Sequence, residues 1–288
     1  MKILVAVDSS KKSHLVETVL ARPWPKGSEF SVISVVDMRQ WEGLPALIED
    51  ARHEAESIVK TASEQMSKTG QAVTTAIPEG SPKTAITDYA KQWHADLIMV
   101  GSHGSNAATR FLLGSVAQSV LRGASCSVEI VRHQPPTPSR GLKILIPTDG
   151  SACSLRAVKE VATRPWPPQS EVRVLSVMQL LTADVPSFSS SMLFASPNLV
   201  DEITKISRTR AEDSVAAAQQ TLSATGIPVY GATPLGDPRG VILDEASEWN
   251  ADLIILGSHG LHGLEHFLIG SVAESVAAYA KCSVEVVR

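Results

Sequence analysis

The chain has 288 residues, of which 43% are hydrophobic and 19% are charged, and its formal net charge is −4. This length suits two domains of about 140 residues, each large enough to bury a core without disulfides or metal clips. The acidic balance and the lack of a basic run argue against nucleic acid as a partner, and no apolar run is long enough to span a membrane.

The first half predicts strands and helices in alternation. A strand at 3–7 opens the chain and reaches Asp8 too soon for a secretory signal, so we expect a cytoplasmic location. The elements expected after it are a helix near 11–21, a strand at 30–36, a helix from Pro45 to Thr69 that Gly70 stops, a strand at 72–76, a helix from Pro82 to about His94, a strand at 97–100, a helix from Ser115 to Gly123 and a strand at 127–131. Such alternation predicts an α/β fold with a five-stranded, mostly parallel, doubly wound sheet.

The second half repeats the first almost end to end. The run Ala-Asp-Leu-Ile at 95–98, followed by Gly-Ser-His-Gly at 101–104, returns at 251–254 and 257–260. The turn Arg-Pro-Trp-Pro stands at both 22–25 and 164–167, where we expect a packing corner. Self-similarity of this kind indicates a duplicated domain. We therefore expect two tandem Rossmann-like domains, at 1–132 and 142–288.

Two segments do not belong to the repeated unit. Residues 133–141 are rich in proline and predict an extended, semi-stiff linker. The register of the repeat slips by 14 residues in the second half, which places an insertion around Thr182 to Leu199. Because this insertion is rich in serine and holds two prolines, we expect a loop over one face of the second domain.

A glycine-rich turn follows the fourth strand of each half. In the first half, Gly101 and Gly104 precede Gly114 and Ser115, and the second half repeats the spacing with Gly257, Gly260, Gly270 and Ser271. Glycines let backbone N–H groups approach an anion closely, and a helix that begins at such a turn adds unpaired N–H groups and its dipole. The pattern therefore predicts a phosphate cradle, although glycines with a capping serine also occur at turns that serve geometry alone.

An aspartate ends the first strand of each half. Asp8 and Asp149 stand beside the fourth strand in a doubly wound strand order, where a carboxylate accepts hydrogen bonds from ribose hydroxyls. The alternative is that the aspartate caps the next helix, a role that Ser9, Ser10 or Ser151 could take instead.

These motifs together resemble the universal stress protein (UspA) family, and the resemblance covers both halves. It implies a tandem member of the ATP-binding branch, with Mg²⁺ carried by the nucleotide and no metal ligands from the protein. Asp8 would hold the ribose, and Ala6, Val7 and Val35 would line the adenine. By the same resemblance, the phosphate side in the first half and the whole site in the second half would comprise Gly101, Gly104, Gly114, Ser115, Val116, Pro147, Thr148, Asp149, Val177, Gly257, Gly260, Gly270, Ser271 and Val272, and His103 and His259 flank these glycines. Ala6 departs from the proline often found in the family's nucleotide binders, which Pro147 keeps.

Other chemistries find less support in the sequence. Neither a P-loop nor a dinucleotide-binding glycine motif occurs at a strand-to-helix turn. His262 and His266 are four residues apart near His259, yet no cysteine or carboxylate cluster accompanies them as a metal site would require. Phosphate or solvent contact is the expected role of these histidines and of His103. Cys153 lies beside the second site near a helix start, a position that can lower the pKa of a thiol.

The closing strands, at 127–131 and 283–287, must lie at an edge of their sheets. Because an unprotected edge pairs with another strand, we expect the two closing strands to pair and form an internal pseudo-dimer with pseudo-two-fold symmetry. Whole chains could further associate in pairs.

Three classes of function remain after this reading. The favoured one is a cytoplasmic, regulatory ATP-binding protein of the stress response, which acts through a partner that the sequence does not identify. The rival is a scaffold or chaperone-like interaction protein whose glycine turns are architectural. The weakest is an enzyme, because the sequence offers no paired carboxylates, Ser-His-Asp set or cradle lysine, and any ATP hydrolysis would be slow and metal-assisted.

Overall fold

The computed structural model of the chain describes residues 1–10, 14–41, 44–68, 70–103, 113–132, 140–179, 197–261 and 269–288. The first half consists of β1 (Lys2–Ala6), α1 (Leu15–Ala21), β2 (Glu29–Ile33), η1 (Met38–Trp41), α2 (Pro45–Ser67), β3 (Ala72–Ala76), α3 (Pro82–Trp93), β4 (Leu97–Gly101), α4 (Ser115–Gly123) and β5 (Ser127–Val131). The second half consists of β6 (Lys143–Pro147), α5 (Ala152–Thr163), β7 (Glu171–Leu175), α7 (Pro197–Leu222), η2 (Ser223–Thr225), β8 (Val229–Ala232), α8 (Pro238–Glu248), β9 (Leu253–Gly257), α9 (Ser271–Tyr279) and β10 (Ser283–Val287).

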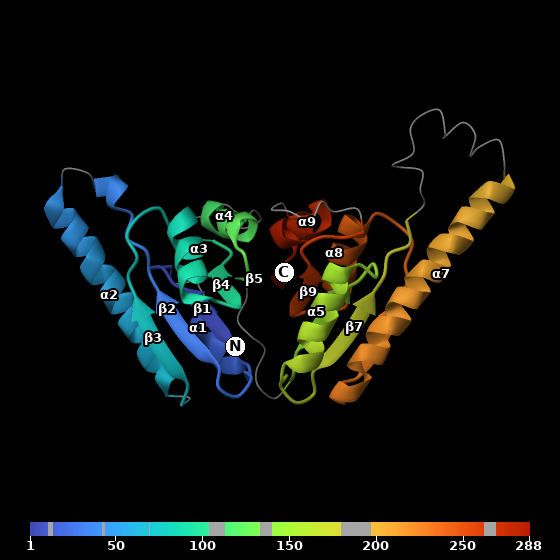
Figure 1. Cartoon of the computed structure of the whole chain (residues 1–288), viewed down its shortest axis with the longest axis horizontal. Coiled ribbons are helices and arrows are strands. Elements are labelled where there is room, and N and C mark those ends of the chain that lie inside the picture. The colour runs from blue at the N-terminus through green and yellow to red at the C-terminus, as the bar shows by residue number, and fades with distance from the viewer. Residues whose placement is uncertain are drawn as a thin grey trace.

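The strands of both halves form one sheet. Within the described residues it has ten strands in the order β3-β2-β1-β4-β5-β10-β9-β6-β7-β8. Every neighbouring pair inside a half is parallel, as in the pairing of β1 with β2 and with β4. This confirms the predicted α/β fold of two tandem, doubly wound units, and Figure 1 shows the two units side by side with α2 and α7 on the outer flanks.

The two closing strands meet at the centre of the sheet. β5 and β10 pair antiparallel, with Val128 opposite Val286, Glu129 opposite Glu285 and Ile130 opposite Val284. The closing strands therefore do pair within one chain. All residues of both strands are buried, which an exposed edge strand would not allow.

The two faces of the sheet are covered differently. On one face, a single hydrophobic core runs across both halves and includes Ile86 of α3, Val120 of α4, Ile242 of α8 and Val276 of α9. On the other face, the cores are separate: one packs α1 and α2 on the first half, and one packs α5 and α7 on the second. The junction of the halves is therefore continuous and apolar on one face only.

Local sequence signals fix several helix starts. Proline stands in the first turn of α2, α3, α7 and α8, where its missing N–H costs no hydrogen bond. The Arg-Pro-Trp-Pro turns are packing corners as expected, since Trp24 packs edge-on against Phe30 with ring centroids 5.7 Å apart. Its Nε1 donates to the carbonyl of Val19 at 2.9 Å, and Trp166 donates in the same way to Val161 at 2.8 Å.

Some expected boundaries were wrong. The strand expected at 30–36 covers Glu29–Ile33, after which Val36 makes only an isolated bridge to Glu79. Of the loop expected at 182–199, residues 197–199 already belong to α7, because Pro197 opens that helix. Residues 180–196 and linker residues 133–139 lie outside the described residues, as do residues 11–13 of the first expected helix, which begins at Leu15.

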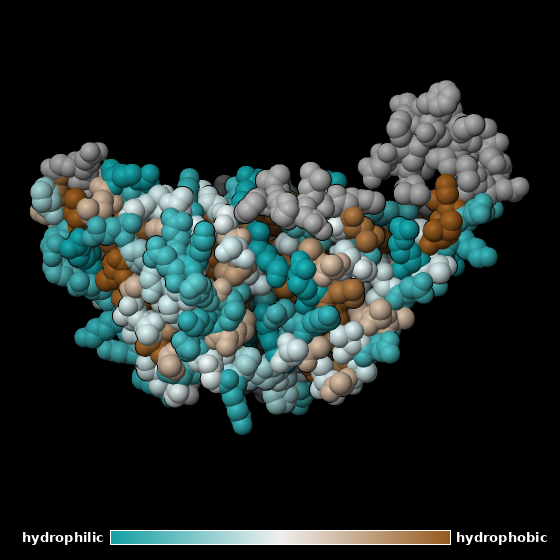
Figure 2. All heavy atoms as spheres, viewed as in Figure 1, coloured by the Kyte–Doolittle hydropathy of each residue, from teal (hydrophilic) through white to brown (hydrophobic). Residues whose placement is uncertain are grey.

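The surface of the described residues has no membrane-spanning character. None of the described helices combines the length and the apolarity that crossing a bilayer would take. The face of the molecule in Figure 2 mixes hydrophilic and hydrophobic residues along the helices.

Candidate functional site

The predicted site residues gather where the strand order reverses. After β1 the chain builds outward through β2 and β3, and it then returns to the other side of β1 with β4. The carboxyl ends of β1 and β4 are neighbours, with Ala6 opposite Val100. β6 and β9 repeat the arrangement in the second half. Each half therefore holds its glycine turn and its aspartate at the crevice where doubly wound folds bind ligands.

The glycine turn brings the exit of β4 against the start of α4. The backbone N–H of Gly114 donates to the carbonyl of Ser102 at 2.8 Å, and Gly270 donates to Ser258 at 2.7 Å in the second half. Gly114 and Gly270 are the N-cap residues of α4 and α9, and neither helix has a side-chain cap. Ser115 does not cap its own helix, as a capping serine at this turn would, because it is already the first helical residue and its side chain is exposed.

Close neighbours leave no space for a side chain at two glycines of the second turn. A Cβ at Gly257 would lie 2.5 Å from the carbonyl carbon of Cys153, because the start of α5 passes directly over the end of β9. A Cβ at Gly260 would lie 2.6 Å from Oδ2 of Asp149. These glycines allow the end of β6, the start of α5 and the turn after β9 to converge. Gly104, the counterpart of Gly260, lies outside the described residues.

Asp149 connects the end of β6 with the turn that follows β9. Its Oδ1 accepts a hydrogen bond from the backbone N–H of Ser151 at 3.0 Å, and its Oδ2 accepts one from Leu261 at 2.9 Å. The cap of α5 is Ser151, whose Oγ accepts from the N–H of Ser154 at 3.2 Å. The alternative role of Asp149 as a helix cap is therefore taken by serine, as the sequence allowed.

Asp8 occupies the corresponding position in the first half. Its side chain is exposed, and its Oδ1 accepts from the backbone N–H of Ser10 at 3.0 Å. Both aspartates thus lie just beyond the carboxyl end of the first strand of their half, and each accepts a hydrogen bond from the backbone N–H two residues later. A carboxylate has about four acceptor positions, so the two backbone donors on Asp149 leave this carboxylate able to accept further hydrogen bonds.

The apolar residues predicted to lie around the base are all at least partly buried. Ala6, Val35 and Val116 are partly buried against the shared core, and Val177 and Val272 match them in the second half. Pro147 is buried at the end of β6. Thr148 is only 6% exposed, because its hydroxyl contacts Ser154 Oγ at 3.1 Å, so its side chain faces α5 and not the crevice. Val7, its counterpart, packs against the core under α1 and α2.

The two histidines of the glycine turns point their ring nitrogens inward. Nδ1 of His103 lies 2.9 Å from Ser102 Oγ, and Nδ1 of His259 lies 3.1 Å from Ser258 Oγ. Their Nε2 atoms are buried and have no partner among the described residues. Burial lowers the pKa of His259, with Arg288 and Arg156 adding to the shift, so this ring is neutral at pH 7. The solvent contact considered for these histidines is thus not made through their ring nitrogens.

Groups able to hold a metal are not apparent in the part of the chain that the structure describes. It contains no set of three or more histidine, cysteine, aspartate or glutamate side chains placed around a common point. His262 and His266 lie outside the described residues.

The contacts of several charged residues at the starts of α5 and α9 were not predicted from the sequence. Nη2 of Arg156 donates to Cys153 Sγ at 2.9 Å beside the start of α5. Arg122 of α4 pairs with Glu274 in the first turn of α9 and so connects the two halves above the shared core. Nothing in the repeat indicates this pair, because Gln118 stands where α9 has Glu274.

Comparisons with known proteins cover both halves. A family model described as the universal stress protein family matches residues 1–132 and 142–288. A universal stress protein from Mycolicibacterium smegmatis is 28% identical over 314 residues, covering 99% of this chain and 96% of that protein. Another, from Methanocaldococcus jannaschii, is 33% identical over 146 residues, covering 51% of this chain and 81% of that protein. The crystal structure of a universal stress protein from Archaeoglobus fulgidus shares the fold, with a TM-score of 0.68 and 21% identity over 100% of this chain and 96% of that one.

Proposed function

The chain belongs to the universal stress protein family, and from this premise we propose that it is a regulatory protein that binds ATP in each half. The observation that carries the proposal is the start of α4 and α9, where no side chain of the described residues caps the first turn. Both helices begin at a glycine without a side-chain cap, directly beside the end of β4 or β9. Helix N-terminal N–H groups in this position, together with the helix dipole, favour phosphate oxygens.

The remaining contacts of the nucleotide follow from the positions of the neighbouring residues. The phosphates would meet the backbone of Gly101 or Gly257 and the first turn of α4 or α9, including the exposed Ser115 or Ser271. Asp8 or Asp149 would accept from the ribose hydroxyls. The adenine would lie against Ala6 and Val35 in the first half. In the second half, it would lie against Pro147, Val177 and the backbone of Thr148, whose side chain is turned away.

The histidines contribute through the backbone in this proposal. Because the ring nitrogens of His103 and His259 are turned inward, these residues would contribute backbone groups to phosphate binding and not their imidazoles. Mg²⁺ would arrive with the nucleotide, since the described residues offer no cluster of metal ligands. We propose residues 1–132 and 142–288 as the two nucleotide-binding units and the cytoplasm as the location.

A scaffold without nucleotide is the second candidate, and one observation favours it. Both oxygens of Asp149 already accept hydrogen bonds from backbone N–H groups, so this carboxylate also stabilises the turn after β9. If that were its whole role, the glycines would serve only the convergence of strand ends. The two candidates make opposite predictions about nucleotide content.

The test is the identification of small molecules that leave the purified full-length chain on denaturation. Mass spectrometry of the released fraction should find adenine nucleotide, or should find it after incubation with Mg·ATP and removal of the excess. Asp8→Ala/Asp149→Ala should carry less nucleotide under the same treatment. A chain that retains none after incubation would support the scaffold. Loss of the γ-phosphate over hours, abolished in the double variant, would indicate a slow ATPase.

A further inference from the structure

The helices α4 and α9 connect the two proposed nucleotide sites, the first beside the end of β4 and the second beside the end of β9. α4 begins at Gly114, and its last turn lies against the second half, because the carbonyl of Leu121 accepts a hydrogen bond from Nη2 of Arg288. α9 runs the opposite way, and the carbonyl of Ala278 near its end accepts from Nη2 of Arg132 at 3.2 Å. Each helix therefore starts at the site of one half and ends against the other half.

The last turn of α4 brings an arginine to the start of α9. Nε of Arg122 donates to Oε1 of Glu274 at 2.8 Å, and Nη2 donates to the same oxygen. Glu274 follows Ser271 by three residues in the first turn of α9, so the two side chains share one face of the helix. Because the side chains of a helix lean toward its N-terminus, the Glu274 carboxylate leans toward the end of α9 that is proposed to hold phosphate.

The equivalent positions of the first site are neutral. Gln118 stands where α9 has Glu274, and Ala278 stands where α4 has Arg122. The first turn of α9 thus contains an anion that a residue of the other half neutralises, whereas the first turn of α4 has an amide at the same place. The repeat preserves the glycines of both sites but not the charges beside them.

The charge of Glu274 affects a phosphate ligand more than it affects the fold. A carboxylate in the first turn and a phosphate at the helix start compete for the positive end of the same helix dipole, and they repel each other. The side chains of Arg122 and Glu274 are 56% and 31% exposed, and exposed ion pairs contribute little to stability. The main consequence of the pair is therefore that it cancels the repulsion between Glu274 and a phosphate.

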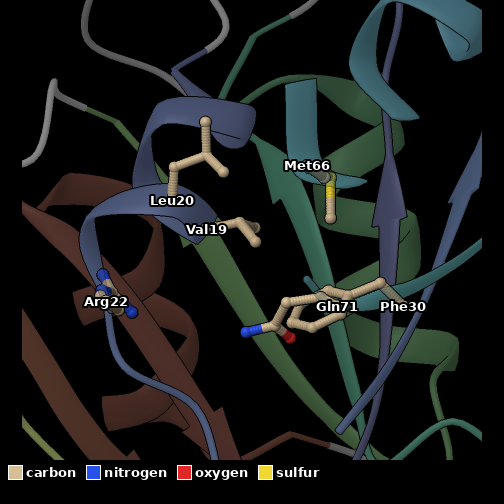
Figure 3. Close-up of a pocket in the computed structure, with 6 residues that line it drawn as sticks. All are labelled: Val19, Leu20, Arg22, Phe30, Met66 and Gln71. Atoms are coloured by element: carbon tan, nitrogen blue, oxygen red, sulfur yellow. The ribbon is translucent and has the colours of Figure 1, made fainter. Parts of the chain in front are cut away.

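The buried ion pairs of the junction do not have this relationship to a nucleotide site. Figure 3 shows Arg22 just after α1, beside a cavity of about 60 Å³ whose wall includes Met66 of α2. Small-molecule sites have volumes of roughly 300–1,000 Å³, so this cavity has room for water but not for a nucleotide. Both Nη atoms of Arg22 bind Glu129. Arg22 therefore serves the junction of the halves, and Arg122 is the arginine of this junction that lies at the start of a phosphate-binding helix.

We propose that Arg122, a positioning residue from the first half, sets the phosphate affinity of the second site by neutralising Glu274. This inference rests on the proposed binding of nucleotide at the start of α9. It makes the affinity of the second site depend on the first half, and it gives the first site no such dependence. The dependence should increase with the number of phosphates on the nucleotide.

The test is isothermal titration of nucleotides into two single-site chains. The Asp8→Ala chain reports the second site, and the Asp149→Ala chain reports the first. Added Arg122→Ala should weaken Mg·ATP binding by about three- to tenfold at the second site and by less than about twofold at the first. At the second site, the loss should shrink from ATP to ADP to AMP, because fewer phosphates remain for Glu274 to repel.

Three further variants in the Asp8→Ala chain separate charge from structure. Glu274→Gln gives α9 the residue of α4, and Arg122→Ala should then have no effect. Arg122→Lys keeps the positive charge and should retain most of the affinity. Arg52→Ala removes an exposed arginine that pairs with Glu79 and should leave the second site unchanged.

The outcomes distinguish this inference from the proposed function. An equal loss at both sites, a loss that persists with Glu274→Gln, or a loss as large for AMP as for ATP would overturn the role of Arg122. Nucleotide binding at the second site that Arg122→Ala does not change would also overturn it, while leaving the proposed function intact. A wild-type chain that binds no nucleotide would overturn the proposed function and this inference together.

Discussion

Glu129 and Glu285 lie directly opposite each other in the central strand pair, and both are fully buried. Each is held by the arginine of its own half, Arg22 or Arg164, through two hydrogen bonds. Arg164 also contacts Glu160 at 3.0 Å. The junction of the two halves is therefore ionic on the face where the hydrophobic cores are separate, and apolar on the opposite face.

This charge cluster specifies the register of the junction. Buried ion pairs add little net stability relative to apolar residues of similar volume, but an unpaired buried charge costs several kcal/mol. A slip of β10 against β5 by one residue would turn Glu285 toward the apolar face, away from Glu129. The cluster therefore selects one pairing of the halves.

The first prediction concerns this cluster. Arg22→Met leaves Glu129 buried without its partner and should lower the free energy of unfolding by about 3–5 kcal/mol. Arg52→Met removes an arginine from an exposed pair with Glu79 and should change it by less than about 0.5 kcal/mol. Urea unfolding of both variants measures the difference. Equal changes in the free energy of unfolding would show that the buried pair matters no more than the exposed one. Arg22→Met/Glu129→Met should recover part of the stability lost in Arg22→Met.

The second prediction concerns pH. Burial raises the pKa of the Glu129 carboxyl from its usual 4.5; Arg22 opposes the rise and Glu285 adds to it. Because the folded chain holds this proton more tightly than the unfolded chain, the associated stability is complete below about pH 4.5 and is lost as pH rises through the folded pKa. The stability of the wild type relative to Glu129→Gln should fall as the pH rises above about 4.5. A difference that grows with pH in parallel urea titrations would contradict the assignment.

The third prediction separates binding from architecture at Asp149. Asp149→Ala removes the carboxylate proposed to hold the ribose and should weaken ATP binding to the second half by about 10- to 100-fold, the range of a charged hydrogen bond. Asp213→Ala, an exposed residue of α7, is the matched control and should leave the affinity unchanged. Calorimetry with Mg·ATP in the Asp8→Ala background isolates the second site. An unchanged affinity together with a lower melting temperature would assign Asp149 a structural role alone.

The fourth prediction concerns the glycines. Gly257→Ala places a methyl group 2.5 Å from the backbone of Cys153 and should destabilise the chain by about 1–3 kcal/mol. Gly240→Ala in α8 meets no atom within 4 Å and should stabilise it by up to about 1 kcal/mol through helix propensity. Melting temperatures of the two variants should therefore move in opposite directions. A neutral Gly257→Ala would mean that the start of α5 does not press on the end of β9.

Much of the fold was predictable from local patterns. The closing strands alternate Val-Glu-Ile or Val-Glu-Val and carry a pairing edge, so their meeting followed from the repeat itself. The helix starts at Pro45 and Pro82 were predictable because the first turn of a helix tolerates the missing N–H of proline. These features depend on residues that are close in sequence or on the internal repeat, and both are visible in one sequence.

The missed features depend on contacts between residues that are distant in sequence. Arg22 binds Glu129, which lies 107 residues later in the chain. In the Arg-Pro-Trp-Pro turn, the sequence indicated a packing role for the tryptophan but no role for the arginine. The pair could have been predicted from Glu129 and Glu285, which stand in otherwise apolar strands, because a buried carboxylate needs a cation as its partner. The inward turn of the Thr148 side chain was not predictable either, since it depends on how α5 packs over β6.

The most direct test of nucleotide binding is isothermal titration of Mg·ATP into the purified, nucleotide-free full-length chain. The account predicts heat of binding with a stoichiometry near two, falling near one in either Asp8→Ala or Asp149→Ala and vanishing in the double variant at the same concentrations. A wild-type chain that gives no heat with ATP, ADP or AMP over a range of temperatures would contradict it and leave the glycine turns as architecture.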